Sequence, residues 1–508
     1  MPPGRAIAFS SLPALAINGP FGDHCQDCAC EVSDVVRSAG TAAGGSAAAV
    51  LTAGEQVRLT RNPEAVAIQL DGAHRALFNP LGDGGVTVLN EAAFEVFSAI
   101  GERTSLAEAL LGWPGREQEA LSVVEHLTDR GLIWPGPSAP PSPATGQARA
   151  AAGRMLTAWL HVTNDCTLRC PYCYVSKSGE GMDERTAHQA VRAVVASAAA
   201  HGYRAVKLKY AGGEASLNWR LIIGMHELAR DLTARAGLDL QATLLSNGVA
   251  LPQALVAALR AEDIRVMISL DGIGELHDAV RPLATGKPTF RLVRRTIGRL
   301  IDAGVPPHLS ITITGRNAVG LADVVRFALE RELTFSFNFF RDNDEAAGQP
   351  GLRYDQQTMI SCLREAFGVI EQMMPRWSVL GSVLDRGQLL RPLQQCCGVG
   401  QDYVVIDQRG RVAQCQMEIG RVLGDVYSDD PVLLVRDSAA PIKSLPVVEK
   451  EGCRECTWRY WCSGGCPVAT FRATGRWDIK SPNCSIYQAI FPEALRLEGL
   501  RLLRYHRP

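Results

Sequence analysis

The chain has 508 residues, of which 46% are hydrophobic and 21% are charged, and its formal net charge is −1 at pH 7. Such values are typical of a soluble protein of two to four domains, and the near-zero charge gives no general attraction to nucleic acid or to an anionic membrane. No apolar run reaches the length of a transmembrane helix, so we expect neither nucleic acid nor a membrane as a partner.

The 15 cysteines lie in separate groups, not spread along the chain. In a long chain, cysteines at metal-ligand spacing indicate metal binding in a reducing compartment, which predicts a cytoplasmic location. The first group, Cys25, Cys28 and Cys30, falls in a segment without periodicity, and we assign it no role. Cys362 stands alone, and eight more cysteines lie between Cys396 and Cys484.

Residues 1–50 are rich in Ala, Gly and Ser and are predicted to be a loosely ordered extension. Residues 51–135 predict a small module of short strands followed by three helices, with Asn90 as the cap of the first helix. A Pro-rich linker follows over residues 136–153.

Residues 154–345 alternate between strand and helix patterns. This order predicts an α/β fold in which parallel strands curl into a partial barrel, with the chemistry at the C-terminal strand ends. The expected strands cover residues 158–163, 205–210, 241–245, 265–270, 309–314 and 334–340. A helical connection (346–395), a Cys-rich domain (396–490) and a C-terminal helix or tail (491–508) are expected to follow.

Cys166, Cys170 and Cys173 come directly after the first strand of this barrel. Thiolates are the ligands of iron–sulfur clusters, and three ligands on a four-iron cluster leave one iron open for chemistry. A structural zinc site is the alternative, but it needs a fourth ligand, and nearby His161 belongs to the strand pattern.

Polar motifs follow the next three strands. Gly212 and Gly213 allow a close backbone approach to a ligand, and the Glu214 carboxylate can hold an ammonium group. Ser246-Asn247 after the third strand fits either a ligand contact or a plain Asn-Gly turn. The fourth strand leads into Ser269-Leu-Asp271 and then Arg281.

The C-x3-C-x2-C loop, followed by these strand ends, resembles the radical S-adenosylmethionine (radical SAM) enzymes. The resemblance implies a four-iron cluster on Cys166, Cys170 and Cys173 that reductively cleaves SAM to a 5′-deoxyadenosyl radical. Ala215 stands where the family usually has Pro. By the same resemblance, the SAM contacts come from Tyr172, Gly212, Gly213, Glu214, Ser246, Asn247, Ser269 and Arg281.

The C-terminal cysteines resemble the SPASM extension, which carries two auxiliary four-iron clusters. The resemblance puts Cys397, Cys415 and Cys466 on the first auxiliary cluster, whose fourth ligand stays open. It puts Cys453, Cys456, Cys462 and Cys484 on the second. A pair of zinc ribbons is the alternative interpretation.

Residues 51–135 resemble the winged-helix module that recognises ribosomally made precursor peptides (the RiPP recognition element), although a generic winged helix fits the pattern nearly as well. Together the resemblances imply a peptide maturase that forms thioether or carbon–carbon crosslinks, with electrons from flavodoxin or ferredoxin. A formylglycine-type sulfatase maturase and a non-catalytic iron–sulfur electron carrier are the alternatives. Asp271, Asp342 and Asp344 are all candidates for a catalytic base.

Overall fold

The computed structural model describes residues 8–10, 57–82, 85–136, 155–390, 392–438 and 445–505. Most of the expected N-terminal extension, with Cys25, Cys28 and Cys30, lies outside the described residues, as does the Pro-rich linker after Gly136. Ala8–Ser10 differs from the expected loose extension, because it forms strand β1, paired antiparallel with β5 (Thr87–Asn90). None of the helices in the described segments combines the length and apolar character needed to cross a membrane.

The predicted parallel strands are all present in the described part of the chain, and they lie side by side in chain order. They are β8 (Met155–His161), β9 (Ala205–Ala211), β10 (Asp239–Ser246), β11 (Arg265–Ser269), β12 (His308–Ile313) and β13 (Phe335–Phe339). All residues of β8 and β9 are buried, as expected for parallel strands covered on both faces. The sheet thus has the form of the predicted partial barrel.

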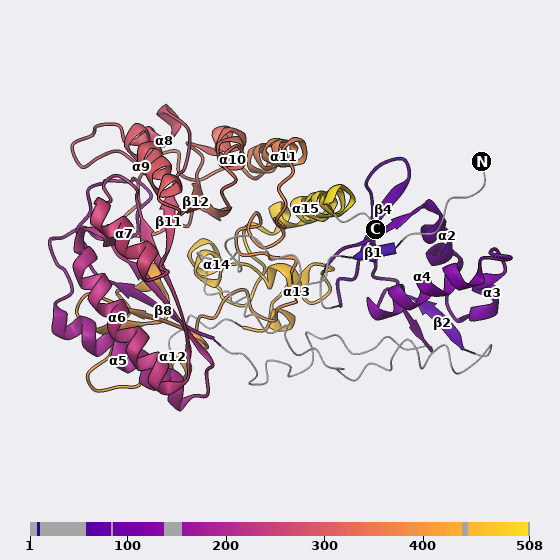
Figure 1. The fold of residues 1–508 in the computed structure, drawn as a ribbon, viewed down its shortest axis with the longest axis horizontal. Coiled ribbons are helices and arrows are strands. Elements are labelled where there is room, and N and C mark those ends of the chain that lie inside the picture. The colour runs from indigo at the N-terminus through magenta and orange to yellow at the C-terminus, as the bar shows by residue number, and fades with distance from the viewer. Residues whose placement is uncertain are drawn as a thin grey trace.

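Helices cover the outer face of this sheet (Figure 1). They are α5 (Glu184–Ala200), α6 (Trp219–Ala236), α7 (Gln253–Ala261), α8 (Glu275–Val280), α9 (Phe290–Asp302), α10 (Leu321–Leu329) and α11 (Gln356–Gln372). Single 3-10 turns lie at Ala215–Asn218, Ala318–Gly320, Gln416–Glu418 and Val447–Glu449. Asp183 is the N-cap at which α5 begins, and Gly237 in the left-handed conformation ends α6.

The sheet continues beyond β8 into the Cys-rich region, which the sequence did not predict. Strand β14 (Tyr403–Ile406) pairs parallel to β8, and β15 (Arg411–Ala413) and β16 (Gly424–Asp425) extend the sheet antiparallel. Helix α12 (Pro431–Asp437) then packs on α5. The Cys-rich region is therefore joined to the barrel by a shared sheet.

The N-terminal module has the predicted strands and helices. Its strands are β2 (Arg58–Arg61), β3 (Val66–Gln69), β4 (His74–Phe78), β5, β6 (Thr104–Ser105) and β7 (Ile133–Pro135), and its helices are α2 (Glu91–Ala99), α3 (Leu106–Leu110) and α4 (Glu117–Asp129). Asn90 caps α2 as predicted, because its side chain accepts a hydrogen bond from the Ala93 amide at 2.9 Å. Two small sheets, in the orders β1-β5-β4-β3 and β6-β2-β7, hold these described elements together.

This module packs directly against the C-terminal part of the chain. Helix α15 (Cys484–Tyr505), which begins earlier than the predicted residue 491, lies against β3, β4, β5 and α11 (Figure 1). Between these elements, the Trp461 indole donates to the Pro80 carbonyl at 2.9 Å, and its ring lies edge-on to Phe78. Trp461 belongs to α13 (Arg459–Cys462), which precedes α14 (Pro467–Thr474). One face of the module, with Leu70, Ala76 and Phe78, thus joins the main hydrophobic core, whereas its helices pack in a separate core.

Candidate functional site

A cavity of about 240 Å³ opens at the C-terminal ends of the barrel strands. All the residues predicted to bind the radical SAM cluster or SAM line this cavity. They are Cys166, Cys170, Tyr172, Cys173, Gly212, Gly213, Glu214, Ser246, Asn247, Ser269 and Arg281. The barrel topology brings these residues together from separate strand ends, as expected for a parallel α/β fold.

The loop after β8 presents three free thiols to this cavity. The Lys177 ammonium donates to the Cys173 sulfur at 3.1 Å, and the Leu168 amide donates to the Cys166 sulfur at 3.4 Å. Burial raises the pKa of the Cys170 thiol to about 12. A buried thiol of this kind ionises only with a strong cationic partner, and metal coordination supplies one.

The spacing of the thiols bears on the kind of metal group. In the described ranges, no three His, Cys, Asp or Glu side chains lie close enough together to bind a single metal ion. A structural zinc ion takes four ligands at about 2.0–2.3 Å, whereas the sequence supplies three cysteines here. Cysteines spaced around a common cavity instead fit a multi-iron cluster, in which each thiolate binds a different iron.

The two glycines after β9 are required by the cysteine loop itself. The Gly213 amide donates to the Thr163 carbonyl at 2.6 Å, and the Glu214 amide donates to the Asp165 carbonyl at 2.8 Å. A Cβ atom on Gly213 would lie 2.2 Å from the Asp165 carbonyl oxygen. The sequence analysis attributed these glycines to close contact with a ligand. In the structure, the backbone of the loop formed by residues 163–165 makes that close contact.

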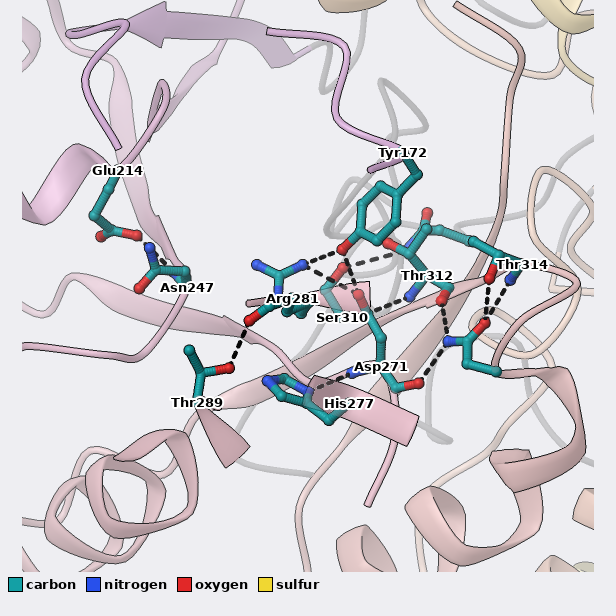
Figure 2. Close-up of polar contacts among 12 residues, drawn as sticks. Tyr172, Glu214, Asn247, Asp271, His277, Arg281, Thr289, Ser310, Thr312 and Thr314 are labelled. Atoms are coloured by element: carbon teal, nitrogen blue, oxygen red, sulfur yellow. Dashed lines mark hydrogen bonds and ion pairs between the residues drawn. The ribbon is translucent and has the colours of Figure 1, made fainter. Parts of the chain in front are cut away.

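The carboxylate of Glu214 is buried and held by three donors. Its Oε1 accepts from the Ser246 hydroxyl at 2.8 Å and from the Ser216 amide at 3.1 Å. Its Oε2 accepts from the Asn247 amide at 2.7 Å (Figure 2). The Asn247 side chain also donates to the Thr167 hydroxyl at 3.1 Å. Ser246 and Asn247 thus tie the carboxylate to the cysteine loop, which is more than a plain turn would do.

Asp271 lies behind the cavity wall in a buried polar network (Figure 2). Its Oδ2 pairs with Arg281 at 3.1 Å, the Tyr172 hydroxyl contacts both groups, and its Oδ1 accepts from the Thr312 amide at 2.8 Å. Because the carboxylate is fully engaged and does not line the cavity, this position favours a role in holding Tyr172 and Arg281 in place.

The other acidic candidates also lie outside this cavity. Asp342 is partly exposed and pairs with Arg353, and Asp344 is highly exposed and pairs with Arg472. Within the Asp271 network, the buried His277 accepts from the Asp271 amide at 3.3 Å, and desolvation lowers its pKa to about 3. The imidazole is therefore neutral at pH 7.

The C-terminal cysteines among the described residues gather in two places. Cys397, Cys415 and Cys466 line a small second cavity of about 20 Å³. The other group is brought together around Cys462, whose pKa rises to about 12 through burial and through the neighbouring Cys453, Cys456 and Cys484.

Cys396 and Cys362 are the described C-terminal cysteines that the prediction left without a cluster. A hydrogen bond from the Cys396 thiol lowers the pKa of Cys397 to about 6, which places the two sulfur atoms side by side. Cys362 is packed in the apolar face of α11, away from both groups.

Among the lining residues that the sequence analysis missed, four belong to both cavities. Arg341, Arg386, Gln416 and Met417 line both the main cavity and the second cavity. Gln416 and Met417 directly follow Cys415, and that adjacency was the available signal. The segment around Arg386 is irregular and has no periodicity from which its position could be inferred.

Residues 160–328 match the model of the Radical SAM superfamily, so the chain contains a radical SAM domain. An uncharacterized protein of Methanocaldococcus jannaschii is 28% identical over 298 residues, which cover 58% of this chain and 93% of that protein. The sporulation killing factor maturation protein SkfB of Bacillus subtilis is 33% identical over 167 residues, 33% of this chain and 38% of SkfB. The radical SAM domain is thus similar to part of a protein whose name describes it as a maturation protein.

Among solved structures, native anSMEcpe with bound AdoMet superposes with a TM-score of 0.57 at 19% identity. The match covers 69% of this chain and 100% of that one. It establishes the α/β fold of the radical SAM type and, at this identity, nothing finer.

Proposed function

We propose that this chain modifies a ribosomally made precursor peptide by radical SAM chemistry, forming a thioether or carbon–carbon crosslink. The observation that carries the proposal is that the three thiols and the strand-end polar residues, predicted separately, line one cavity. The relationship to SkfB, whose name describes it as a maturation protein, supports a peptide substrate.

In this proposal Cys166, Cys170 and Cys173 hold a four-iron cluster. When bound there, the cluster supplies the electron that splits SAM into methionine and a 5′-deoxyadenosyl radical, which takes a hydrogen atom from the peptide. Lys177 lies against Cys173 and offsets part of the negative charge of the thiolates.

Glu214 would hold the ammonium group of SAM. A carboxylate has about four acceptor positions, and three of them are occupied by Ser246, Ser216 and Asn247. The remaining position on Oε2 is available to an ammonium group, and the three fixed donors keep the carboxylate from turning away.

The two C-terminal cysteine groups would hold auxiliary four-iron clusters in a SPASM-type domain (396–490). The cavity of Cys397, Cys415 and Cys466 shares part of its lining with the main cavity, which supports a role close to the substrate. Residues 51–135 would recognise the precursor peptide, and flavodoxin or ferredoxin in the cytoplasm would supply electrons.

The test uses the full chain, reconstituted anaerobically with iron and sulfide and given SAM and dithionite. We expect 5′-deoxyadenosine by chromatography and about twelve irons per chain. Co-expression with the short reading frames next to its gene should yield a peptide that has lost two hydrogens by mass spectrometry. SAM cleavage with all peptides unchanged would refute the proposal.

The alternatives give different results in the same experiment. An electron carrier forms no 5′-deoxyadenosine. A formylglycine-type maturase yields an aldehyde that reacts with a hydrazide probe, whereas a crosslinked peptide does not react and resists fragmentation between the linked residues.

A further inference from the structure

The wall between the two cavities contains an arginine whose side chain makes no hydrogen bond to the described part of the chain. Arg386 lines both the main cavity and the cavity of Cys397, Cys415 and Cys466. Its guanidinium makes no hydrogen bond or ion pair with any of the residues that the structure describes, although it is only partly exposed. Against the effect of burial, the charges of Cys466, Asp385 and Cys397 act on this guanidinium and raise its pKa, but none of them donates to it or accepts from it. Its N–H donors therefore stay open to an anionic ligand, and such charge-assisted bonds are strong in a recess.

The other cations that line the main cavity are already paired. Among the described residues these are Lys177, which donates to Cys173, Arg281, which pairs with Asp271, and Arg341. Arg341 pairs with Asp385 through two bonds of 2.7 and 3.0 Å.

Asp385 has no capacity left for its neighbour Arg386. Besides Arg341, its Oδ1 accepts from the Phe339 amide at 3.0 Å, and its Oδ2 accepts from the Tyr487 hydroxyl at 3.2 Å. The carboxylate that lines the cavity among the described residues is Glu214, which is held by its own three donors. Arg386 is therefore the cation left for a ligand.

Gln416 offers a second donor in the lining of the same two cavities. The Gln416 Oε1 accepts from the Tyr403 hydroxyl at 2.8 Å, which fixes the side-chain amide so that its NH2 group is free to donate. Gln416 lines the same two cavities as Arg386. A guanidinium fork and an amide NH2 group together match the geometry of a carboxylate.

We propose that Arg386, assisted by Gln416, binds the side-chain carboxylate of an Asp or Glu residue of the peptide substrate next to the reacting centre. This inference rests on the proposed function and names a chemical feature of its substrate. SAM also carries a carboxylate, but the contacts expected for it, Ser269 and Arg281, line the main cavity and not the second cavity that Arg386 shares.

The experiment measures binding and does not depend on turnover. N-acetyl-aspartate methylamide and N-acetyl-glutamate methylamide are titrated into the reconstituted full chain with SAM, and binding is followed by ligand-detected NMR. The neutral asparagine and glutamine analogues serve as matched probes. We expect the acids to bind about tenfold or more tightly than the amides, as for a charge-assisted pair in a cavity.

The preference should disappear in Arg386→Gln and be partly retained in Arg386→Lys, which keeps the charge but loses the fork. The lysine variant also serves if the glutamine variant does not fold. Arg421→Gln is the control, because Arg421 pairs with Glu418 at 2.8 Å, is half exposed and lines neither cavity. SAM affinity, measured by equilibrium dialysis, should not change in the Arg386 variants.

Equal binding of acids and amides, or an unchanged preference in Arg386→Gln, would overturn the inference. A loss of SAM affinity in Arg386→Gln would assign the guanidinium to SAM and overturn it as well. A shift in the reduction potential of the reconstituted protein without any acid preference would show that Arg386 only offsets thiolate charge. If acids are preferred through Arg386 but no peptide is modified, the proposed function fails and the carboxylate site stands.

Discussion

Replacing Gly213 by alanine tests whether the cysteine loop is positioned by the backbone behind it. The added Cβ would lie 2.2 Å from the Asp165 carbonyl oxygen and 2.6 Å from that of Asn164. Both are backbone atoms, so the loop must move by about 1 Å to reach ordinary contact. Overpacking of this kind costs about 1–3 kcal/mol. Losing the two backbone bonds to Thr163 and Asp165 adds about 1 kcal/mol each, so we expect a loss of roughly 3–5 kcal/mol in the free energy of unfolding.

The same movement should impair chemistry more than folding. It separates the three thiols from Glu214, and a displacement of about 1 Å in a reacting geometry costs on the order of 100-fold in rate. The assay is 5′-deoxyadenosine formation by the reconstituted protein, together with urea denaturation and iron content. Gly224→Ala in α6 is the matched control, since nothing lies within 4 Å of its added Cβ.

The control should keep full SAM cleavage and gain up to about 1 kcal/mol, because alanine is the better helix former. A Gly213→Ala protein with unchanged stability and unchanged 5′-deoxyadenosine formation would refute the reasoning. A loss of rate with full stability would mean instead that the glycine serves SAM directly, as the sequence first suggested.

Three further predictions concern the parts around the cavity. Asp271→Asn leaves the buried Arg281 without its charge partner and should lower the free energy of unfolding by about 3–5 kcal/mol in urea denaturation. Trp461→Phe removes the bond to the N-terminal module, at about 1 kcal/mol, and should speed limited proteolysis of residues 57–136, whereas Leu111→Ala on the exposed face of the module should not. Because the folded pKa of His277 is lowered to about 3 from 6.5, the unfolded chain takes up a proton first as the pH falls. Stability should therefore decrease from about pH 6.5 towards pH 3, less steeply in His277→Gln, in urea denaturation at stepped pH.

Each of these has a contradicting outcome. A stable Asp271→Asn protein would show that water or another group compensates Arg281. Equal proteolysis of the Trp461 and Leu111 variants would mean that the indole does not hold the module. The same pH dependence with and without the imidazole would place the acid sensitivity in other groups.

The barrel strands and the two cysteine groups were predictable because their signals are local. Each strand is an apolar run between helical patterns, and the spacing of Cys453, Cys456 and Cys462 puts these thiols within one short loop region. A cap such as Asn90 is read from a few neighbouring residues in the same way.

The parts that were missed depend on contacts between distant segments. Tyr403–Ile406 is a short apolar run, which periodicity alone cannot assign, and its partner strand β8 lies far upstream in the chain. Asp271 was placed correctly at a strand end, but only the three-dimensional structure shows that Tyr172 and Arg281 cover it. The same holds for Arg386. Only the structure shows that the neighbouring Asp385 carboxylate is bound by Arg341, which leaves the Arg386 guanidinium open to a ligand.

Helix α15 has a consequence for the order in which the chain folds during synthesis. It begins at Cys484 and packs its later turns on Leu70 and Ala76 of the N-terminal sheet, where the absence of a side chain at Gly499 allows close contact. The ribosome makes that sheet more than 390 residues before its covering helix, because Asn90 ends β5 and Cys484 begins α15. A nascent chain must therefore carry an apolar patch through most of its translation, and we expect it to bind chaperones until α15 emerges. When α15 folds, it covers the apolar face of the N-terminal sheet and at the same time brings Cys484 to Cys453, Cys456 and Cys462.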